Sequence, residues 1–201
     1  MACGFDPLHF GQREPDAVSV NLYALVGYIP APLGDFLDSL RCQLVPNCRL
    51  RSHVSFLPPR PILGSPQDAW QQIEQMSLHT PRFQVDLGKV NVFCKTSVIY
   101  LDLAQGMDQL FRAHRSLNQC ALHYDEPFEY HPHITLAQKF PIADLARIQE
   151  VAEREWDGYR KDRSFEVEKI TFVQNNLLPG FDQNGLQNNQ WIDLAECSLA
   201  R

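Results

Sequence analysis

The 201-residue chain has no apolar stretch close to the roughly 18 residues that a membrane-spanning helix requires. The first residues, Met1 to Asp6, lack both the basic segment and the apolar segment of a secretory signal peptide. We therefore expect a protein that neither spans a membrane nor is exported, with a cytoplasmic location.

Cysteine pairs with the spacing of metal ligands are also missing. None of the six cysteines forms a C-x-x-C pair: they are Cys3, Cys42, Cys48, Cys94, Cys120 and Cys197. In a chain without an export signal, such cysteines are expected to be reduced thiols. The cysteines therefore predict neither a disulfide framework nor a thiolate metal site.

An excess of basic residues is absent as well. The chain has 18 Lys and Arg against 24 Asp and Glu, a formal net charge of −6. Binding of long nucleic acids depends on neutralising many phosphates. We therefore expect no long duplex as partner, and any phosphate recognition to occur at a local site, on a small nucleotide or an RNA terminus. The length and the 44% hydrophobic content suit one globular domain, which we expect to be monomeric.

Two short runs that resemble each other are the most informative feature of the chain. Residues 53–55 read His-Val-Ser and residues 133–135 read His-Ile-Thr, eighty positions apart, each inside a short apolar stretch. Successive side chains of a strand point to opposite faces. If both runs are strands, each places an imidazole and a hydroxyl on one face and apolar side chains on the other.

The order of expected elements around these runs repeats. In each half a strand, a helix, a histidine-containing strand, a second helix and a third strand follow one another. Apolar periodicity and turn signals place the elements at residues 18–26, 33–44, 52–57, 65–80 and 83–93, and again at 97–103, 107–117, 132–137, 145–156 and 165–173. This order predicts an α+β fold made of a duplicated unit, with two mainly antiparallel sheets flanked by helices.

The ends of the chain differ from the repeated part. Residues 1–17 show no periodicity, and we expect an irregular N-terminal extension before a single bilobal domain over residues 18–201. A final strand is expected to begin at residues 191–194. The segment 175–190, rich in Asn, Gln and Gly, is expected to be either a lid or a plain hairpin connection.

Two histidines that face each other across a cleft suit acid–base chemistry. Histidine titrates near neutral pH, so one neutral and one protonated imidazole serve as general base and general acid in the same turnover. We take His53 and His133 as the catalytic candidates. The hydroxyls of Ser55 and Thr135 are candidates to hydrogen-bond the oxygens of a phosphate, and this arrangement needs no metal and no cofactor.

With these motifs the chain resembles the 2H phosphoesterase superfamily, also called the 2′–5′ RNA ligase or cyclic phosphodiesterase family, whose signature is one His-x-Thr/Ser motif in each lobe. The resemblance extends from about Val18 to Leu194. It implies that both motifs line a central groove between two lobes. It also implies hydrolysis of a 2′,3′-cyclic phosphate, typically to a 2′-phosphate, or chemistry at a 2′–5′ linkage, with ligation as the reverse direction. Which histidine is the base, and which direction operates, stay open.

The chain departs from the family pattern after the second motif. Many relatives carry an arginine there, whereas this chain has Gln138 and Lys139. Lys139 shares the strand parity of His133 and would supply the positive charge if the strand extends that far; a solvated lysine is the alternative. Tyr130, beside the second motif, is a candidate to stack on a base at the mouth of the groove. Arg51 is a weaker candidate for a phosphate contact.

The same sequence allows two other interpretations, a zinc site and a binding protein without catalysis. His131 and His133 form an H-x-H pair near several carboxylates and would suit zinc, but no third ligand can be assigned. A protein of the same fold that binds a nucleotide or an RNA end without catalysis is the alternative function, because fold does not fix function. The appearance of product from a cyclic nucleotide distinguishes the binding module from the enzyme.

Overall fold

The computed structural model describes residues 21–46, 48–181 and 187–201. The expected N-terminal extension, residues 1–17, lies outside these ranges, as does the start of the strand expected from residue 18. Within the described ranges, no helix has the length and apolar character needed to cross a bilayer.

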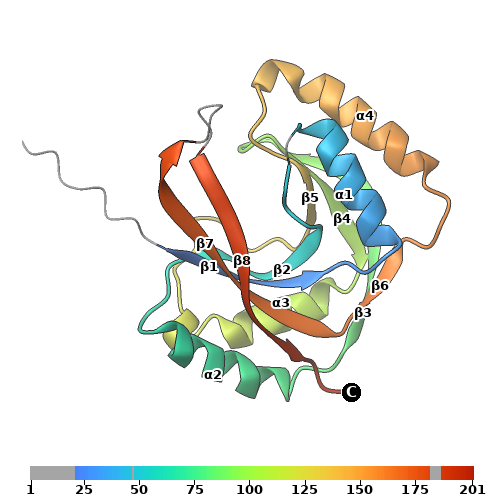
Figure 1. Cartoon of the computed structure of the whole chain (residues 1–201). Helices are drawn as coiled ribbons and strands as arrows, with labels where there is room; N and C mark the ends of the chain where they lie inside the picture. The colour runs from blue at the N-terminus through green and yellow to red at the C-terminus, as the bar shows by residue number, and fades with distance from the viewer. Residues whose placement is uncertain (1–20, 47, 182–186) are drawn as a thin grey trace, which may run out of the picture.

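The elements follow the expected order, with one additional strand at the C-terminal end (Figure 1). The first half contains β1 (Leu22–Tyr28), α1 (Leu33–Leu44), β2 (His53–Arg60), α2 (Pro66–Ser77) and β3 (Phe83–Phe93). The second half contains β4 (Val98–Gln105), α3 (Met107–Leu117), β5 (Ile134–Ala137), α4 (Leu145–Gly158), β6 (Ser164–Val167), β7 (Lys169–Phe181) and β8 (Gln187–Ser198). Two 3₁₀ turns, Cys120–Leu122 and Ile142–Asp144, flank β5.

The strands form two four-stranded antiparallel sheets that exchange elements between the halves. One sheet has the order β2-β1-β7-β8 and the other has the order β5-β4-β3-β6. The strand β3 of the first half therefore pairs with β4 of the second half, and β7 of the second half pairs with β1 of the first. Both motif strands, β2 and β5, are edge strands of their sheets.

The helices are exchanged in the same way. The helix α1 of the first half packs on β5 and beside α4, and α4 packs on β3. The helix α3 of the second half packs on β2 and beside α2. In Figure 1, α1 and α4 lie together over one sheet and α2 and α3 over the other. The expected α+β fold with two lobes built from a duplicated unit is thus confirmed.

The start of α2 has a clear local cause. At α2, the Ser65 side chain accepts a hydrogen bond from the Asp68 amide, and the Asp68 carboxylate accepts one from the Ser65 amide. This capping box, with proline in the first turn, fixes where the helix begins.

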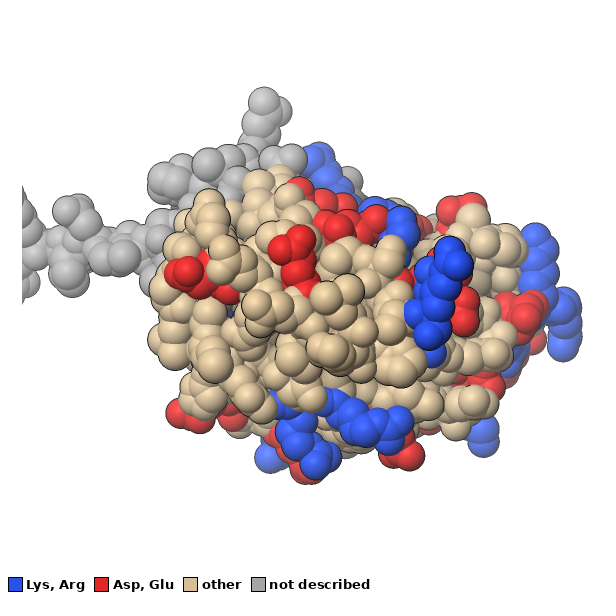
Figure 2. All heavy atoms as spheres, turned by 90° about the horizontal axis from the view of Figure 1, so that it is seen from below, with Lys and Arg blue, Asp and Glu red and all other residues tan. Residues whose placement is uncertain are grey.

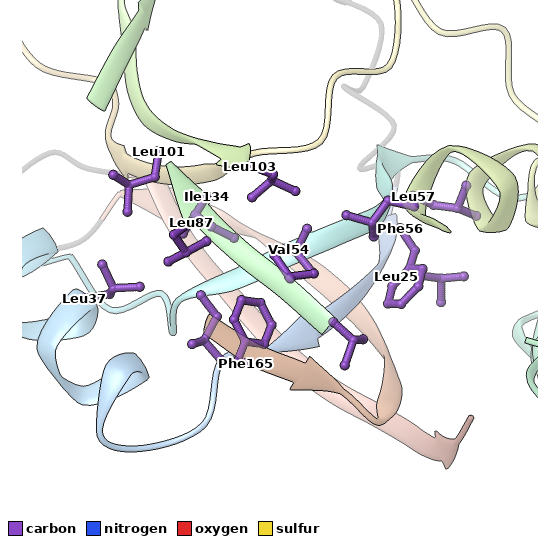
Figure 3. Close-up of a cluster of buried hydrophobic side chains, with 14 of the residues drawn as sticks. Leu25, Leu37, Val54, Phe56, Leu57, Leu87, Leu101, Leu103, Ile134 and Phe165 are labelled. Atoms are coloured by element: carbon purple, nitrogen blue, oxygen red, sulfur yellow. The ribbon is translucent and has the colours of Figure 1, made fainter. Parts of the chain in front are cut away.

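The apolar faces of the two motif strands meet in one core. Val54 and Phe56 of β2 and Ile134 of β5 are each 0% exposed. In Figure 3 their side chains lie in the same cluster as Leu101 and Leu103 of β4. The core therefore joins the two lobes directly behind the motifs, and the opposite faces of β2 and β5 are left for the histidines and hydroxyls.

One expectation about the C-terminal third is wrong. The single strand expected at residues 165–173 is two strands, because the chain leaves one sheet after β6 and enters the other with β7. Most of the segment 175–190 is also strand, since β7 and β8 pair from Lys169–Ser198 up to Phe181–Gln187. A hairpin connection therefore fits this segment, and its tip, residues 182–186, lies outside the described ranges.

The surface charge is dispersed on the face shown in Figure 2. Basic and acidic side chains alternate around a broad area of uncharged residues, and no continuous basic surface covers this face. This distribution agrees with the excess of acidic residues in the chain.

Candidate active site

The two motifs occupy equivalent positions in the two lobes. From residue 51 to 59 and from residue 131 to 139, the sequence of exposed, half-buried and buried side chains is identical. In both runs the histidine and the hydroxyl residue are half-buried, while the residues after each of them are buried. The alternation expected from strand parity is therefore present in both motifs. His133 lies directly before β5 rather than within it.

The two histidine rings are held by the same hydrogen bond. Nδ1 of His53 lies 2.7 Å from the carbonyl oxygen of Arg51, and Nδ1 of His133 lies 2.7 Å from the carbonyl oxygen of His131. A carbonyl oxygen only accepts, so Nδ1 carries the proton in each neutral ring. Nε2 is then the basic nitrogen, and within the described ranges neither Nε2 has a hydrogen-bond partner in the protein.

Both rings line one groove between the lobes. The groove has a volume of about 1040 Å³, and its wall includes His53, Ser55, His133 and Thr135. The motif strands β2 and β5 lie next to each other across it. The structure therefore brings the four residues of the two motifs to a common cavity.

The environment favours the neutral form of both imidazoles. Burial lowers the pKa of His53 to about 4, and the charges of Arg41 and His133 act in the same direction, against the Arg51 carbonyl and Asp38. Burial also lowers the pKa of His133, against the hydrogen bond to the His131 backbone oxygen, while the charge of the His131 ring acts in the same direction as burial. An anion bound between the rings would raise both values, since an opposite charge favours the protonated imidazole.

Aromatic side chains flank each histidine. The ring of Tyr28, opposite His53 on β1, meets the imidazole edge to face with centroids 6.3 Å apart. On the other side, Phe93 and Tyr100 stack on each other at 4.0 Å and both meet the ring of His133 edge to face. These contacts restrict the orientation of both imidazoles.

Arg51 and Asp193 close the groove beside His53. The guanidinium of Arg51 lies 3.8 Å from the centre of the Tyr28 ring, and its Nη1 is 3.9 Å from Asp193 Oδ2. The hydroxyl of Tyr28 donates to Asp193 Oδ1 at 2.6 Å, and burial raises the pKa of that hydroxyl. Arg51 itself is exposed at the groove wall, so its side chain is accessible to an anion there.

The structure places Lys139 differently from the expectation. The strand β5 ends at Ala137, and Lys139 has a left-handed backbone with φ of 59°. The strand parity that would have pointed Lys139 with His133 is therefore lost. Lys139 is exposed and lines a smaller adjoining pocket, which shares His133, Thr135 and Gln138 with the groove.

Tyr130 lines the groove but is not free to stack on a base. The side chain is 9% exposed, and its ring stacks on His114 with centroids 3.9 Å apart. Its hydroxyl donates to the backbone oxygen of Ser55 at 2.6 Å. The expected base contact at the groove mouth is therefore wrong, because the ring and the hydroxyl are engaged inside the protein.

Arg41 is a buried cation of the groove that no sequence pattern predicted. Arg41 lies on α1, is 2% exposed and lines the groove. Its Nη1 donates to the backbone oxygen of Thr135 on β5, and its Nη2 lies 3.7 Å from Cys48 Sγ. Arginine is almost never fully buried without a partner. No local pattern indicates this role, since the partner strand is more than ninety residues away.

The zinc interpretation lacks a third ligand in the structure too. In the part of the chain that the structure describes, no three His, Cys, Asp or Glu side chains are grouped to hold a metal ion. The ring of His131 instead packs edge to face on Phe93, with centroids 5.2 Å apart. The backbone oxygen of His131 holds the ring of His133.

Known structures share this architecture. LigT of E. coli in its apo form matches with a TM-score of 0.60 and 15% identity, over 90% of this chain and 98% of LigT. LigT of E. coli complexed with 3′-AMP matches with a TM-score of 0.58 and 13% identity, over 90% of this chain and 99% of LigT. At such identities the likeness concerns the fold.

Sequence comparison is more specific than the shared fold. A candidate phosphoesterase of Geobacillus kaustophilus (strain HTA426) is 30% identical over 135 residues, which cover 63% of this chain and 74% of that protein. A second one, from Geobacillus thermodenitrificans (strain NG80-2), is 27% identical over the same shares. The family model of the 2′-5′ RNA ligase superfamily matches residues 29–177, a range that includes both histidine motifs and the strands that carry them. On this match the chain belongs to the 2′-5′ RNA ligase superfamily.

Proposed function

We propose that this protein is a phosphoesterase that uses His53 and His133 as general base and general acid on a 2′,3′-cyclic phosphate or a 2′–5′ phosphodiester. One observation carries the proposal: in both His53 and His133, Nδ1 is hydrogen-bonded to a backbone oxygen. These bonds fix the orientation of each ring and leave its Nε2 as the basic atom. General acid–base groups of this kind typically contribute about 10²–10⁴-fold each to the rate.

In hydrolysis of a cyclic phosphate, one neutral imidazole removes a proton from water through Nε2. The water oxygen then attacks phosphorus, and the bond from phosphorus to one ribose oxygen breaks. The other imidazole, protonated in the presence of the anionic phosphate, delivers its proton to that ribose oxygen. The product carries a 2′-phosphate when the bond to the 3′ oxygen breaks. Each histidine thus transfers one proton, and no step requires a metal or cofactor.

The hydroxyls of Ser55 and Thr135 are proposed to hydrogen-bond the non-bridging phosphate oxygens. Both belong to the groove wall and lie two residues after a histidine on the same strand face. Such donors stabilise the charge that develops on the phosphate oxygens. Their loss is expected to affect the rate less than loss of either histidine.

The proposed substrate is a small nucleotide or an RNA terminus. LigT of E. coli, which shares the fold, has been solved with 3′-AMP, with ATP and with NADP⁺. The groove of about 1040 Å³ has the size of a small-molecule site. The excess of acidic residues disfavours a long duplex. Ligation through a 2′–5′ bond would be the same chemistry in reverse, with the roles of the two histidines exchanged.

Replacement of either histidine tests the mechanism. We expect His53→Ala and His133→Ala each to lower kcat for a 2′,3′-cyclic nucleotide by at least about 10²-fold, because each removes one proton-transfer group. Ser55→Ala and Thr135→Ala are expected to cause smaller losses. The measurement is steady-state kinetics, with circular dichroism to show that the variants are folded.

The matched control is His123→Ala. His123 is half exposed, and its ring lies 3.8 Å from Asp125 outside the groove. We expect this variant to keep wild-type kinetics. Wild-type kinetics in either motif variant would refute the two-histidine mechanism. Binding of the nucleotide without any product in the wild type would favour the non-catalytic binding module instead.

A further inference from the structure

Two buried side chains cross between the halves of the molecule and bind the backbone of the opposite motif. The Tyr130 hydroxyl, from the second half, donates to the Ser55 carbonyl at 2.6 Å. The Arg41 guanidinium, from the first half, donates to the Thr135 carbonyl. Ser55 and Thr135 are the equivalent hydroxyl residues of the two motifs. Each motif is therefore held at its hydroxyl residue: a side chain of the other half donates a hydrogen bond to the backbone oxygen of that residue.

The position of the motif strands explains why such bonds matter. Both β2 and β5 are edge strands, so each has one side without a neighbouring strand. The backbone of an edge strand is held on one side only by its sheet. A hydrogen bond from the other half fixes that backbone relative to the opposite lobe. The shared core behind the motifs holds the two lobes together. The two hydrogen bonds add a restraint on the backbone of Ser55 and Thr135, which face the groove.

Tyr130 is itself firmly held. Its ring stacks on His114, whose Nε2 lies 2.8 Å from Glu126 Oε1. Glu126 also pairs with the guanidinium of Arg60, which is 1% exposed and lies at the end of β2. The Tyr130 hydroxyl therefore extends from a buried network that is anchored on the same strand as Ser55. Among the described residues of this network, the Tyr130 hydroxyl is the group that bonds to the motif backbone.

Arg41 contributes a charge as well as a hydrogen bond. His53 is faced by Arg41 and Asp38 from α1 and by His133 from the other motif. The ring of Tyr28 on β1 and the backbone oxygen of Arg51 also contact its imidazole. Arginine stays protonated at all relevant pH values. Its buried charge favours the neutral form of the His53 ring, and the Tyr130 hydroxyl has no such effect.

We infer that Arg41 and Tyr130 are positioning residues that hold the two motifs at the separation at which both histidines reach one phosphate. The inference rests on the proposed function, because it requires that His53 and His133 act on the same phosphorus. A displacement of about 1 Å at a reacting centre costs on the order of 10²-fold in rate. Two bonds that restrain the same separation are expected to be energetically coupled.

The experiment compares Tyr130→Phe, Arg41→Met, Arg41→Lys and the double variant Tyr130→Phe with Arg41→Met. Each single change to Phe or Met is expected to lower kcat for a 2′,3′-cyclic nucleotide by about 10- to 100-fold, with KM changed less. The double variant should lose less than the product of the two single losses. Tyr130→Phe removes a single oxygen atom, so it remains informative if Arg41→Met does not fold.

The pH profile separates the two residues. In Arg41→Met the limb of the kcat/KM profile that His53 controls should move to higher pH, because protonated His53 is no longer repelled by the guanidinium. In Tyr130→Phe this limb should stay in place. Arg41→Lys should return this limb to its wild-type position but not restore the full kcat, because an ammonium does not reproduce the planar fork of the guanidinium. A residue with only a structural role would move neither the profile nor the ratio of kcat to KM.

The matched controls remove equivalent groups outside the groove. Tyr23→Phe removes the hydroxyl of a tyrosine that is 8% exposed and stacks on Phe172. Arg163→Met removes a guanidinium that donates to the Trp156 backbone oxygen at 2.6 Å. Neither residue lines the groove. Both controls should keep the wild-type kcat, whatever they cost in stability.

Hydrogen exchange supplies a readout that is independent of turnover. Tyr130→Phe should accelerate amide exchange at residues 53–57, and Arg41→Met should accelerate it at residues 133–137. If the wild type does not convert the cyclic nucleotide, the proposed function is contradicted. The exchange rates at the two motifs would then still test whether Arg41 and Tyr130 hold the motif backbones. Unchanged exchange at both motifs, or unchanged kcat in both single variants of an active enzyme, would overturn the inference.

Discussion

At the scale of single residues, the tautomer of two imidazoles determines what the site can do. The oxygens of Arg51 and His131 hold the Nδ1 proton of the two rings, so both rings present Nε2 as the basic atom. A histidine without such a bond would populate both tautomers and rotate. The backbone two residues before each histidine thus supplies the orientation that a carboxylate provides in a catalytic triad.

The lowered pKa of His53 predicts a pH-dependent stability. The folded protein binds a proton at His53 only near pH 4, whereas the unfolded chain binds it near the ordinary value of 6.5. The contribution of His53 to stability is therefore full above pH 6.5 and is lost as the pH falls toward 4. We expect the free energy of unfolding of His53→Gln to fall less than that of the wild type over this interval.

Urea denaturation at several pH values between 7 and 4 measures this difference. His123→Gln is the matched control, since His123 is half exposed, and it should follow the wild type. Equal slopes for the wild type and His53→Gln would show that burial of His53 does not affect its protonation.

At the scale of elements, the helices α1 and α2 differ in whether they contribute residues to the groove. The helix α1 carries Arg41 and reaches β5, so a change in α1 acts on the site. The helix α2 contributes no residue to the groove. Its capping box at Ser65 stabilises the fold without contact to the motifs.

Ser65→Ala tests this division. Loss of an N-cap side chain typically costs about 1 kcal/mol of stability. We expect thermal unfolding at a lower temperature, with kcat for the cyclic nucleotide equal to that of the wild type below the transition. A loss of kcat comparable to that of Tyr130→Phe would indicate that α2 does position the motifs.

The sequence predicted the elements better than their partners. Apolar periodicity and turn signals located the helices, because these signals are local. The strand expected at 165–173 was wrong because residues on both sides of Glu168 are equally suited to strands. Which sheet each part joins depends on neighbours that are distant in sequence. Likewise, periodicity could not reveal that β3 and β7 exchange between the halves.

At the scale of the whole molecule, the duplication explains why two distant motifs form one site. Exchange of strands and helices places β2 and β5 at facing sheet edges over a shared core. The residues that face each other are related by the repeat, as the identical burial of residues 51–59 and 131–139 shows. The two lobes thus provide two imidazoles in equivalent positions. A phosphate bound between them would favour protonation of one ring, which then differs from the other in charge.

The site was predictable to the extent that it is repeated. His53, Ser55, His133 and Thr135 were found because their spacing occurs twice, and the structure places all four in the groove. Arg41 binds the backbone oxygen of a residue in the other half, so nothing in its local sequence indicated it. Tyr130 was noticed for its place beside the motif, but its hydrogen bond to β2 depends on the fold.

The most direct test of the account is the identity of the product formed from a 2′,3′-cyclic nucleotide, followed by phosphorus NMR. We expect conversion to a 2′-monophosphate by the wild type, and no conversion on the same time scale by His53→Ala or His133→Ala. Conversion at the wild-type rate by either variant would contradict the claim that two histidines, one from each lobe, carry out the reaction.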